Sequence, residues 1–139
     1  MLRQIFVNLP IQDMARSQAF FKALGLSFNP RFTNEQGACL EIAENIYAML
    51  LVKPFFQGFT KLPVADATQT TEVLIALSCD SRAEVDDLVA MAVAAGGTTP
   101  NAPQDHGFMY QHGFADPDGH QWEVFYMDEA AFAQQAQQA

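Results

Sequence analysis

The chain has 139 residues, the length of one ordinary domain, and 50% of them are hydrophobic, which is enough to bury a real core. Sixteen acidic and seven basic residues give a formal net charge of −9. This charge argues against nucleic acid as a partner, because phosphate binding requires a basic surface. An acidic surface is typical of a soluble cytoplasmic protein, and it also attracts cationic small molecules.

Cysteine usage and hydropathy also predict a location in the cytoplasm. Cys39 and Cys79 lie far apart in apolar runs, without the C-x-x-C spacing of a zinc or redox site. We therefore expect free thiols in a reducing cytosol. The apolar run at the N-terminus is too short for a signal peptide, and no stretch approaches the roughly 18 apolar residues of a membrane span. The sequence predicts a cytoplasmic protein that does not bind membranes.

The first segment, "QIFVNLPIQD" (residues 4–13), is rich in β-branched and aromatic residues and predicts a strand. A helix is expected to follow, with Asp13 as its N-cap and Gly25 as its stop signal. The helical face that we expect to be buried consists of Met14, Ser17, Phe21 and Leu24.

Three short strands are predicted after this helix. They are "LSFNPRF", "GACLEIA" and "IYAMLLV", separated by turns at residues 34–37 and 44–45.

The second half begins with a predicted strand, "EVLIALSCD" (residues 72–80). Ser81 and Glu84 then have capping-box spacing at the start of a predicted helix that ends at Gly96. The apolar stripe of that helix consists of Val85, Leu88, Val89 and Ala92.

Three strands are again predicted after the helix, around residues 98–99, 107–115 and 120–127, with a turn at 116–119. Side chains alternate between the two faces of a strand. In the last strand, Gln121, Glu123, Phe125 and Met127 therefore share one face, and Trp122, Val124 and Tyr126 share the other.

The order strand, helix and three strands thus occurs twice, which predicts an α+β fold of two βαβββ modules. We assign residues 1–54 to the first module, 72–128 to the second and 129–139 to a polar C-terminal tail. The long connection, residues 55–71, is either a lid or contact arm, or a linker pinned by its phenylalanines.

The repeated pattern, with "PIQDMARSQAFFKALGL" early and "QDHGFMY" and "DPDGHQWEVF" late, resembles the vicinal oxygen chelate superfamily. That superfamily contains glyoxalase I, bleomycin-resistance proteins and extradiol dioxygenases, and the likeness is greatest to its bacterial glyoxalase-like branch. The resemblance implies a single glyoxalase-like domain over residues 1–128, in which two modules form a U-shaped, barrel-like mixed sheet around a ligand cavity, with the helices outside. It also implies a homodimer.

Metal-binding members of that superfamily place ligands in the first and last strand of each module. Carried over by position, the last strand of the second module supplies Glu123. The other positions fall on Phe6 (with Asn8 on the same strand face), on Leu74 and near Leu50. Divalent metals need several nitrogen or oxygen donors, so we expect no metal cofactor at the usual site.

A remodelled site for Zn, Fe, Mn or Ni is the alternative, built from His106, His112 and Glu123. His112 shares a strand face with Phe108, Tyr110 and Phe114, which favours a half-buried aromatic stripe over a ligand set. His120 is expected to be an exposed turn residue.

The resemblance implies that the Glu123 side of the last strand faces the cavity. The main functional hypothesis is a small-molecule binding protein of the bleomycin-resistance kind. An enzyme of glyoxalase or dioxygenase type is the alternative, with Glu123 as base, or as metal ligand, and His106 or Tyr110 as its acid/base partner. A purely structural dimer is the third possibility. The expected ligand-binding residues are Phe6, Asn8, Leu74, Gln121, Glu123 and Phe125.

Overall fold

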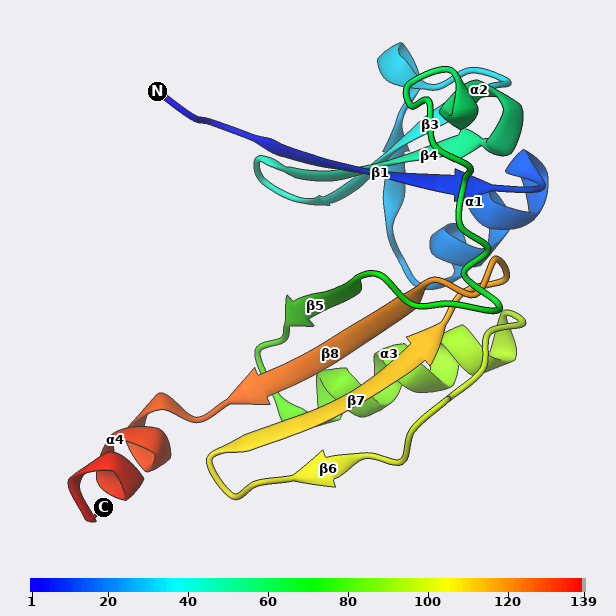
Figure 1. The fold of residues 1–139 in the computed structure, drawn as a ribbon. Helices are drawn as coiled ribbons and strands as arrows, with labels where there is room; N and C mark the ends of the chain where they lie inside the picture. The colour runs from blue at the N-terminus through cyan, green and yellow to red at the C-terminus, as the bar shows by residue number, and fades with distance from the viewer. Residues whose placement is uncertain (139) are drawn as a thin grey trace. The chain divides into compact units, whose positions relative to one another are not determined.

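The computed structural model describes residues 1–138 and divides the chain into two units, Met1–Thr70 and Thr71–Ala139 (Figure 1). Each unit has one four-stranded mixed sheet that does not close on itself, and within the described residues the chain has four α-helices. The predicted α+β class is confirmed. The last residue of the predicted C-terminal tail, 139, lies outside the described residues.

The first unit has the strand order β1-β4-β3-β2. Strand β1 runs parallel to β4, and the other neighbours are antiparallel. Its strands are β1 (Ile5–Ile11), β2 (Ser27–Asn29), β3 (Gly37–Ala43) and β4 (Ile46–Val52). Its helices are α1 (Met14–Ala23), the single-turn 3-10 helix η1 (Pro30–Phe32) and α2 (Lys53–Gln57).

Helix α1 begins and ends where the sequence predicts. The Asp13 carboxylate accepts a hydrogen bond from the Arg16 backbone N–H at 3.1 Å, which satisfies one of the free donors of the first turn. Gly25 follows the helix with φ of +88°, a conformation that glycine adopts without steric cost. Both predicted boundary signals are confirmed.

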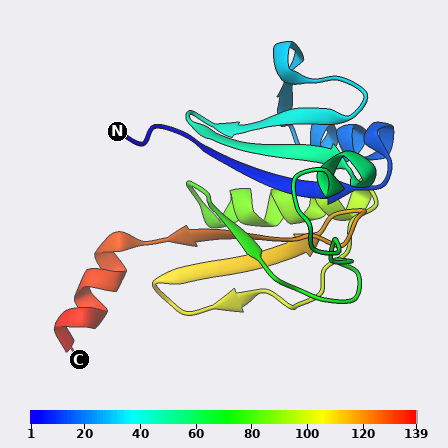
Figure 2. The ribbon, with the colours of Figure 1, turned by 45° about the horizontal axis from the view of Figure 1, so that its top comes forward.

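The core of the first unit lies between α1 and the sheet, which are in contact (Figure 2). Leu40 and Leu50 are fully buried in the sheet, and Phe20 and Phe21 are buried on the helix, where their rings pack edge to face. Phe20 is missing from the predicted helical stripe, which named Phe21. The buried stripe is wider than predicted because neighbouring helical positions, 100° apart, can both reach a flat sheet.

The second unit repeats this topology with the strand order β5-β8-β7-β6, in which β5 is parallel to β8. Its strands are β5 (Leu74–Ser78), β6 (Gln104–Asp105), β7 (Met109–Ala115) and β8 (Gln121–Met127). Its helices are α3 (Arg82–Ala94) and α4 (Glu129–Gln138).

One predicted strand of this unit is misplaced. Thr98 forms only an isolated bridge with Ala115, and the fourth strand is β6, a few residues further along. Pro100 and Pro103 lie between them. Proline has no backbone N–H to donate to a ladder, so pairing resumes only after Pro103.

Helix α3 contacts strands β7 and β8 on one side of this sheet (Figures 1 and 2). The Ser81 hydroxyl accepts a hydrogen bond from the Glu84 backbone N–H at 3.1 Å, so the predicted N-cap is confirmed. Val85, Val89 and Ala92 of the predicted stripe are buried, while Leu88 is half-buried.

The two segments outside the modules differ in structure. The predicted connection contains the end of α2 and is otherwise irregular, whereas the tail forms α4. Among the described residues, the helices are all too short or too polar to cross a membrane.

Candidate ligand-binding face

The strand pairing of the second unit defines the sheet face opposite α3, and nine residues form the central part of this face. Residues aligned across neighbouring strands share a face, and we call this group the Glu123 face. Strand β5 contributes Leu74, Ala76 and Ser78; β8 contributes Gln121, Glu123 and Phe125; β7 contributes Ala115, Gly113 and Gln111.

Glu123 lies at the centre of this face, between an alanine and a glycine. Its aligned neighbours are Ala76 on β5 and Gly113 on β7. A Cβ atom added at Gly113 would lie 2.8 Å from the Trp122 backbone oxygen, so the close approach of the two strands requires glycine there. The glutamate is half-buried. The surface around it, which we call the floor of the face, carries no large side chain on either neighbouring strand.

Larger side chains lie towards the two ends of this face. The Gln121 side-chain amide donates a hydrogen bond to the Thr71 hydroxyl at 2.9 Å, and the Gln111 amide donates one to Gln104 at 3.0 Å. Leu74 has 51% of its surface exposed and Phe125 is half-buried. Two fixed amides and two apolar side chains therefore surround the central carboxylate.

The alternate residues of β8 face the helix. Trp122 and Val124 are buried, at 1% exposure each, on the side that α3 covers, which confirms the predicted alternation. On β7, Tyr110, His112 and Phe114 align with this set, since His112 pairs with Val124 and Phe114 with Trp122. His112 and Tyr110 therefore lie on the face of the sheet opposite Glu123.

The predicted partners of Glu123 are consequently not gathered around it. The His112 ring lies 3.2 Å from the Asn101 carbonyl oxygen, and the Tyr110 hydroxyl donates a hydrogen bond to Asp86 of α3 at 2.6 Å. His106 is exposed in the loop between β6 and β7, with its ring 6.4 Å from that of Phe108.

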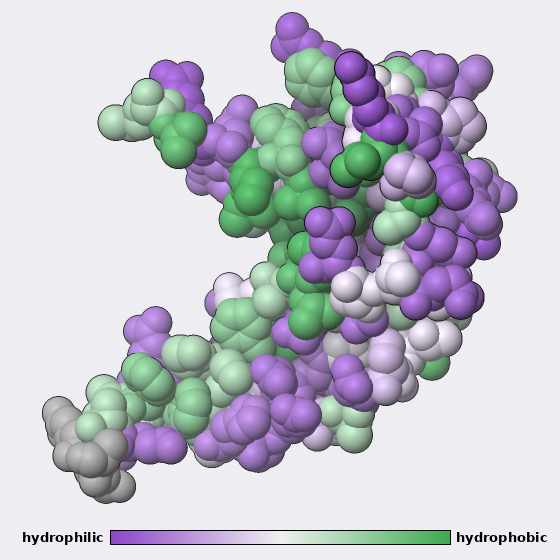
Figure 3. All heavy atoms as spheres, viewed as in Figure 1, coloured by the Kyte–Doolittle hydropathy of each residue, from purple (hydrophilic) through white to green (hydrophobic). Residues whose placement is uncertain are grey.

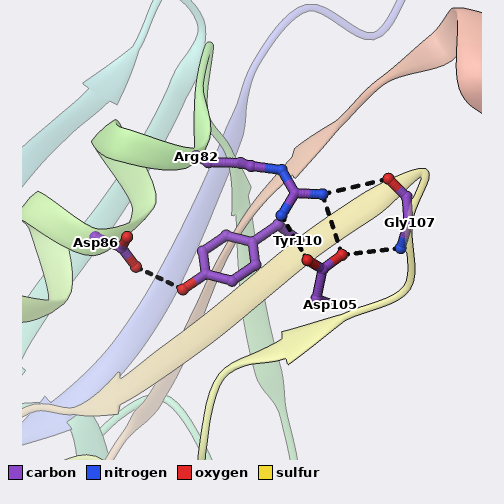
Figure 4. Close-up of polar contacts among 5 residues, drawn as sticks. All are labelled: Arg82, Asp86, Asp105, Gly107 and Tyr110. Carbon is purple, nitrogen blue, oxygen red and sulfur yellow. Dashed lines mark hydrogen bonds and ion pairs between the residues drawn. The ribbon is translucent and has the colours of Figure 1, made fainter.

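That loop is held to the start of α3 by Arg82 (Figure 4). The Arg82 guanidinium donates two hydrogen bonds to Asp105, at 2.7 and 3.0 Å, and one to the Gly107 carbonyl at 3.3 Å. It also lies over the Tyr110 ring, 5.2 Å from its centre. The hydrogen bonds from Arg82 are the main cause that lowers the pKa of Asp105 to about 2, and the bond to Asp86 raises the pKa of Tyr110.

The ion pair between Arg82 and Asp105 should make the stability of the fold depend on pH. A folded-state pKa of about 2, below the ordinary 3.8, means that the pair contributes stability above pH 3.8, and that this contribution is lost as the pH falls through 2. Carbon-detected NMR titration of the Asp105 carboxyl should give a midpoint near 2, and Arg82→Gln should move it toward 3.8. Arg3→Gln, at an exposed position of the other unit, should leave it in place. An unchanged midpoint in Arg82→Gln would refute this assignment.

The turn before β8 is a buried polar cluster. The Asp116 carboxylate accepts hydrogen bonds from the Trp122 indole N–H and from the backbone N–H groups of Asp118 and His120, each at 3.0 Å. Burial raises the pKa of Asp116. The prediction that His120 is exposed is wrong: only 8% of it is exposed, and its backbone is hydrogen-bonded to the buried Asp116 in both directions.

The corresponding face of the first unit carries Phe6 and Asn8. The Phe6 ring stacks on that of Tyr47, with centres 4.8 Å apart, and both Phe6 and Asn8 are exposed. Met49 is aligned with Asn8 and shares this face. The ligand position expected near Leu50 falls on Met49, since Leu50 itself is fully buried on the α1 side.

The metal site that the sequence resemblance implies can be compared with the side chains at its four positions. Phe6 and Met49 in the first unit and Leu74 in the second offer no nitrogen or oxygen side-chain ligand, which leaves Glu123. Among the described residues, three or more His, Cys, Asp or Glu side chains are nowhere grouped so that they could hold a metal. The residues at these positions do not fit the metal.

Ala76 and Gly113 were missed by sequence reasoning. A glycine inside a predicted strand is a signal of close backbone approach, and it could have identified Gly113. Ala76 carries no comparable signal, because its importance depends on the pairing of β5 with β8.

Comparison with known proteins identifies relatives of this fold. Residues 3–43 match the family described as bleomycin resistance protein-like N-terminal. Hypothetical protein SA1046 from S. aureus is 28% identical, with 91% of this chain and 95% of that chain covered and a TM-score of 0.79. No curated protein matches the sequence.

Two further structures share the fold at lower identity. A glyoxalase-related enzyme from Fulvimarina pelagi is 23% identical, with 90% of this chain and 88% of that chain covered and a TM-score of 0.76. Fosfomycin resistance protein FosX from Mesorhizobium loti is 13% identical, with coverages of 91% and 93% and a TM-score of 0.67.

Proposed function

We propose that this chain, which has the fold of the glyoxalase and bleomycin-resistance proteins and an N-terminal segment that matches the latter, binds a small organic ligand on its Glu123 face without a metal. The resemblance read from the sequence is thereby confirmed at the level of family and fold. Ligand binding and independence from metal are the parts that we propose.

The observation that carries the proposal is the composition of the Glu123 face. It combines one carboxylate with amide groups and with apolar side chains that remain accessible, of which Leu74 is 51% exposed. Ligand sites are typically apolar surfaces with a few placed polar groups. Hydrophobic side chains reach the surface of both units (Figure 3).

Independence from metal is supported by the donors. Glu123 stands alone at the family's ligand positions, and a single carboxylate binds a divalent ion weakly. The enzyme alternative gains no support from Tyr110, which lies on the opposite face of the sheet, hydrogen-bonded to Asp86. Binding without chemistry therefore has the better support.

Nile red, a neutral dye that fluoresces when it leaves water, is a suitable first probe. We expect saturable binding by protein dialysed against EDTA, and about tenfold weaker binding by Leu74→Ser, because the exposed leucine would bury most of its apolar surface under the dye. Phe59→Ser is the matched control, since Phe59 is also an exposed apolar residue, at 71%, but lies outside this face. Equal dye affinities for Leu74→Ser and wild type would contradict the proposal.

We also propose that two copies of this chain form a homodimer in the cytoplasm. Strand β1 lies at the edge of its sheet and exposes Ile5 and Phe6, and free edges with apolar residues are templates for association. Cys39 and Cys79 are both free thiols, in keeping with a reducing compartment. Sedimentation equilibrium should give the mass of a dimer, and a monomer at all concentrations would contradict this part.

A further inference from the structure

The charge of the chain is concentrated in its second unit. Of the sixteen Asp and Glu residues, eleven lie in Thr71–Ala139, where Arg82 is the one Lys or Arg residue. The first unit, Met1–Thr70, has five acidic and six basic residues and is close to neutral. An organic cation is therefore attracted to the unit that carries the Glu123 face.

Arg82 is not available to Glu123. Its guanidinium, at the start of α3, donates hydrogen bonds to Asp105 and to the Gly107 carbonyl and lies over the Tyr110 ring (Figure 4). His112 does not neutralise Glu123 either, since it lies on the opposite face of the sheet, and His120 is buried in the turn before β8. The second unit thus supplies no Lys or Arg side chain to neutralise this carboxylate.

Among the side chains that the structure describes, those of residues 1–136, the Glu123 carboxylate has no hydrogen-bond partner or ion pair. It is half-buried, so it is partly removed from water, and a partly desolvated carboxylate gains most from a charged donor. A bound ligand would have to bring that donor itself.

The shape of the floor restricts the ligand further. Ala76 and Gly113 leave no bulky side chain on either side of the carboxylate, and the strand contact at Gly113 leaves no room for a larger residue. Leu74 and Phe125 stand at the edges of this floor. A flat body with a charge in its plane matches this arrangement, because it can cover the floor while its donors reach Glu123.

We propose that the Glu123 face selects a planar organic cation, such as an amidine or a protonated heteroaromatic amine. The cation donates hydrogen bonds to the Glu123 carboxylate, and its flat body covers the floor beside this carboxylate, over Ala76 or Gly113. This inference rests on the proposed ligand-binding function and names the chemical class of the ligand.

Three probes of nearly equal shape test the charge: benzamidine, a cation; benzamide, which is neutral; and benzoate, an anion. Each is titrated into EDTA-treated, ¹⁵N-labelled protein, and binding is followed from the backbone amide signals of β5, β7 and β8. We expect benzamidine to bind about tenfold more tightly than benzamide, because a hydrogen bond between two charged groups is stronger than one from a neutral donor to the carboxylate. Benzoate should bind least, because its negative charge is repelled by Glu123.

Matched variants separate charge from shape. Glu123→Gln should lower the affinity for benzamidine to that for benzamide, while Glu35→Gln, which removes the same charge from an exposed loop of the first unit, should leave the ratio of the two affinities unchanged. Ala76→Leu, at an exposed strand position, should weaken both probes and keep their ratio. The amide spectrum of each variant also reports whether it is folded.

Benzamide or benzoate binding as tightly as benzamidine would overturn the inference, and so would a preference for the cation that survives in Glu123→Gln. Nile red binding to the same face would then still support the proposed function. Failure of all three probes to shift signals of β5, β7 or β8 overturns the inference, and failure of Nile red as well overturns both proposals.

Discussion

Replacing Trp122 by alanine is expected to lower the free energy of unfolding of the second unit by about 3–5 kcal/mol. Trp122 is the largest fully buried side chain, at 1% exposure, and it packs on the α3 side of the sheet beside Phe114. Most domains have only about 5–15 kcal/mol of stability, so the variant should be largely unfolded at modest urea concentrations. Urea titration followed by circular dichroism measures the change.

Trp122→Phe serves as the control for this prediction. It keeps most of the buried aromatic surface but removes the indole N–H that bonds Asp116, and an unpaired buried acceptor costs about 1–3 kcal/mol. Loss of that bond should raise the pKa of Asp116 further. The pH-dependent part of the penalty should be absent while Asp116 is protonated in both folded proteins, and it should grow as the pH rises through the raised folded-state pKa of Asp116. A Trp122→Ala variant within about 1 kcal/mol of wild type would contradict the packing described here.

The second large effect is expected in the first unit. Phe20→Ala should cost about 3–5 kcal/mol, because Phe20 is 1% exposed between α1 and the sheet and its ring packs against that of Phe21. Urea titration is again the measurement. Phe32→Ala is the matched control: its ring is 58% exposed, and its removal should change the stability by no more than about 0.5 kcal/mol. Equal effects of the two substitutions would refute the assignment of Phe20 to the core.

The elements of the fold were predictable because their signals are local. Asp13 and Ser81 cap their helices as expected, and Gly25 ends α1, since each of these roles depends on a few neighbouring residues. The strand expected near residue 98 depended instead on long-range pairing, and Pro100 and Pro103 moved it to β6. Phe20 was missed for a related reason, because the width of a buried stripe is set by the surface that the helix meets.

The candidate site was predictable only in part. Alternation along β8 assigned Glu123 and Trp122 to opposite faces without any knowledge of partner strands. The grouping of His112 with Glu123 required the register across the turn, and the pairing of Gly113 with Glu123 places His112 on the other side. His120 was misjudged because the turn that contains it is buried through Asp116, which no local pattern indicates.

The central claim, that the Glu123 face binds an organic ligand without a metal, is tested most directly by one titration series. Nile red affinity is measured on untreated protein, on the same protein stripped with EDTA, and on stripped protein resupplied with Zn²⁺. Three equal affinities are expected, because, among Phe6, Met49, Leu74 and Glu123, the side chain of Glu123 is the one that offers an oxygen or nitrogen donor to a metal. Binding that disappears on stripping and returns with Zn²⁺ would contradict the claim.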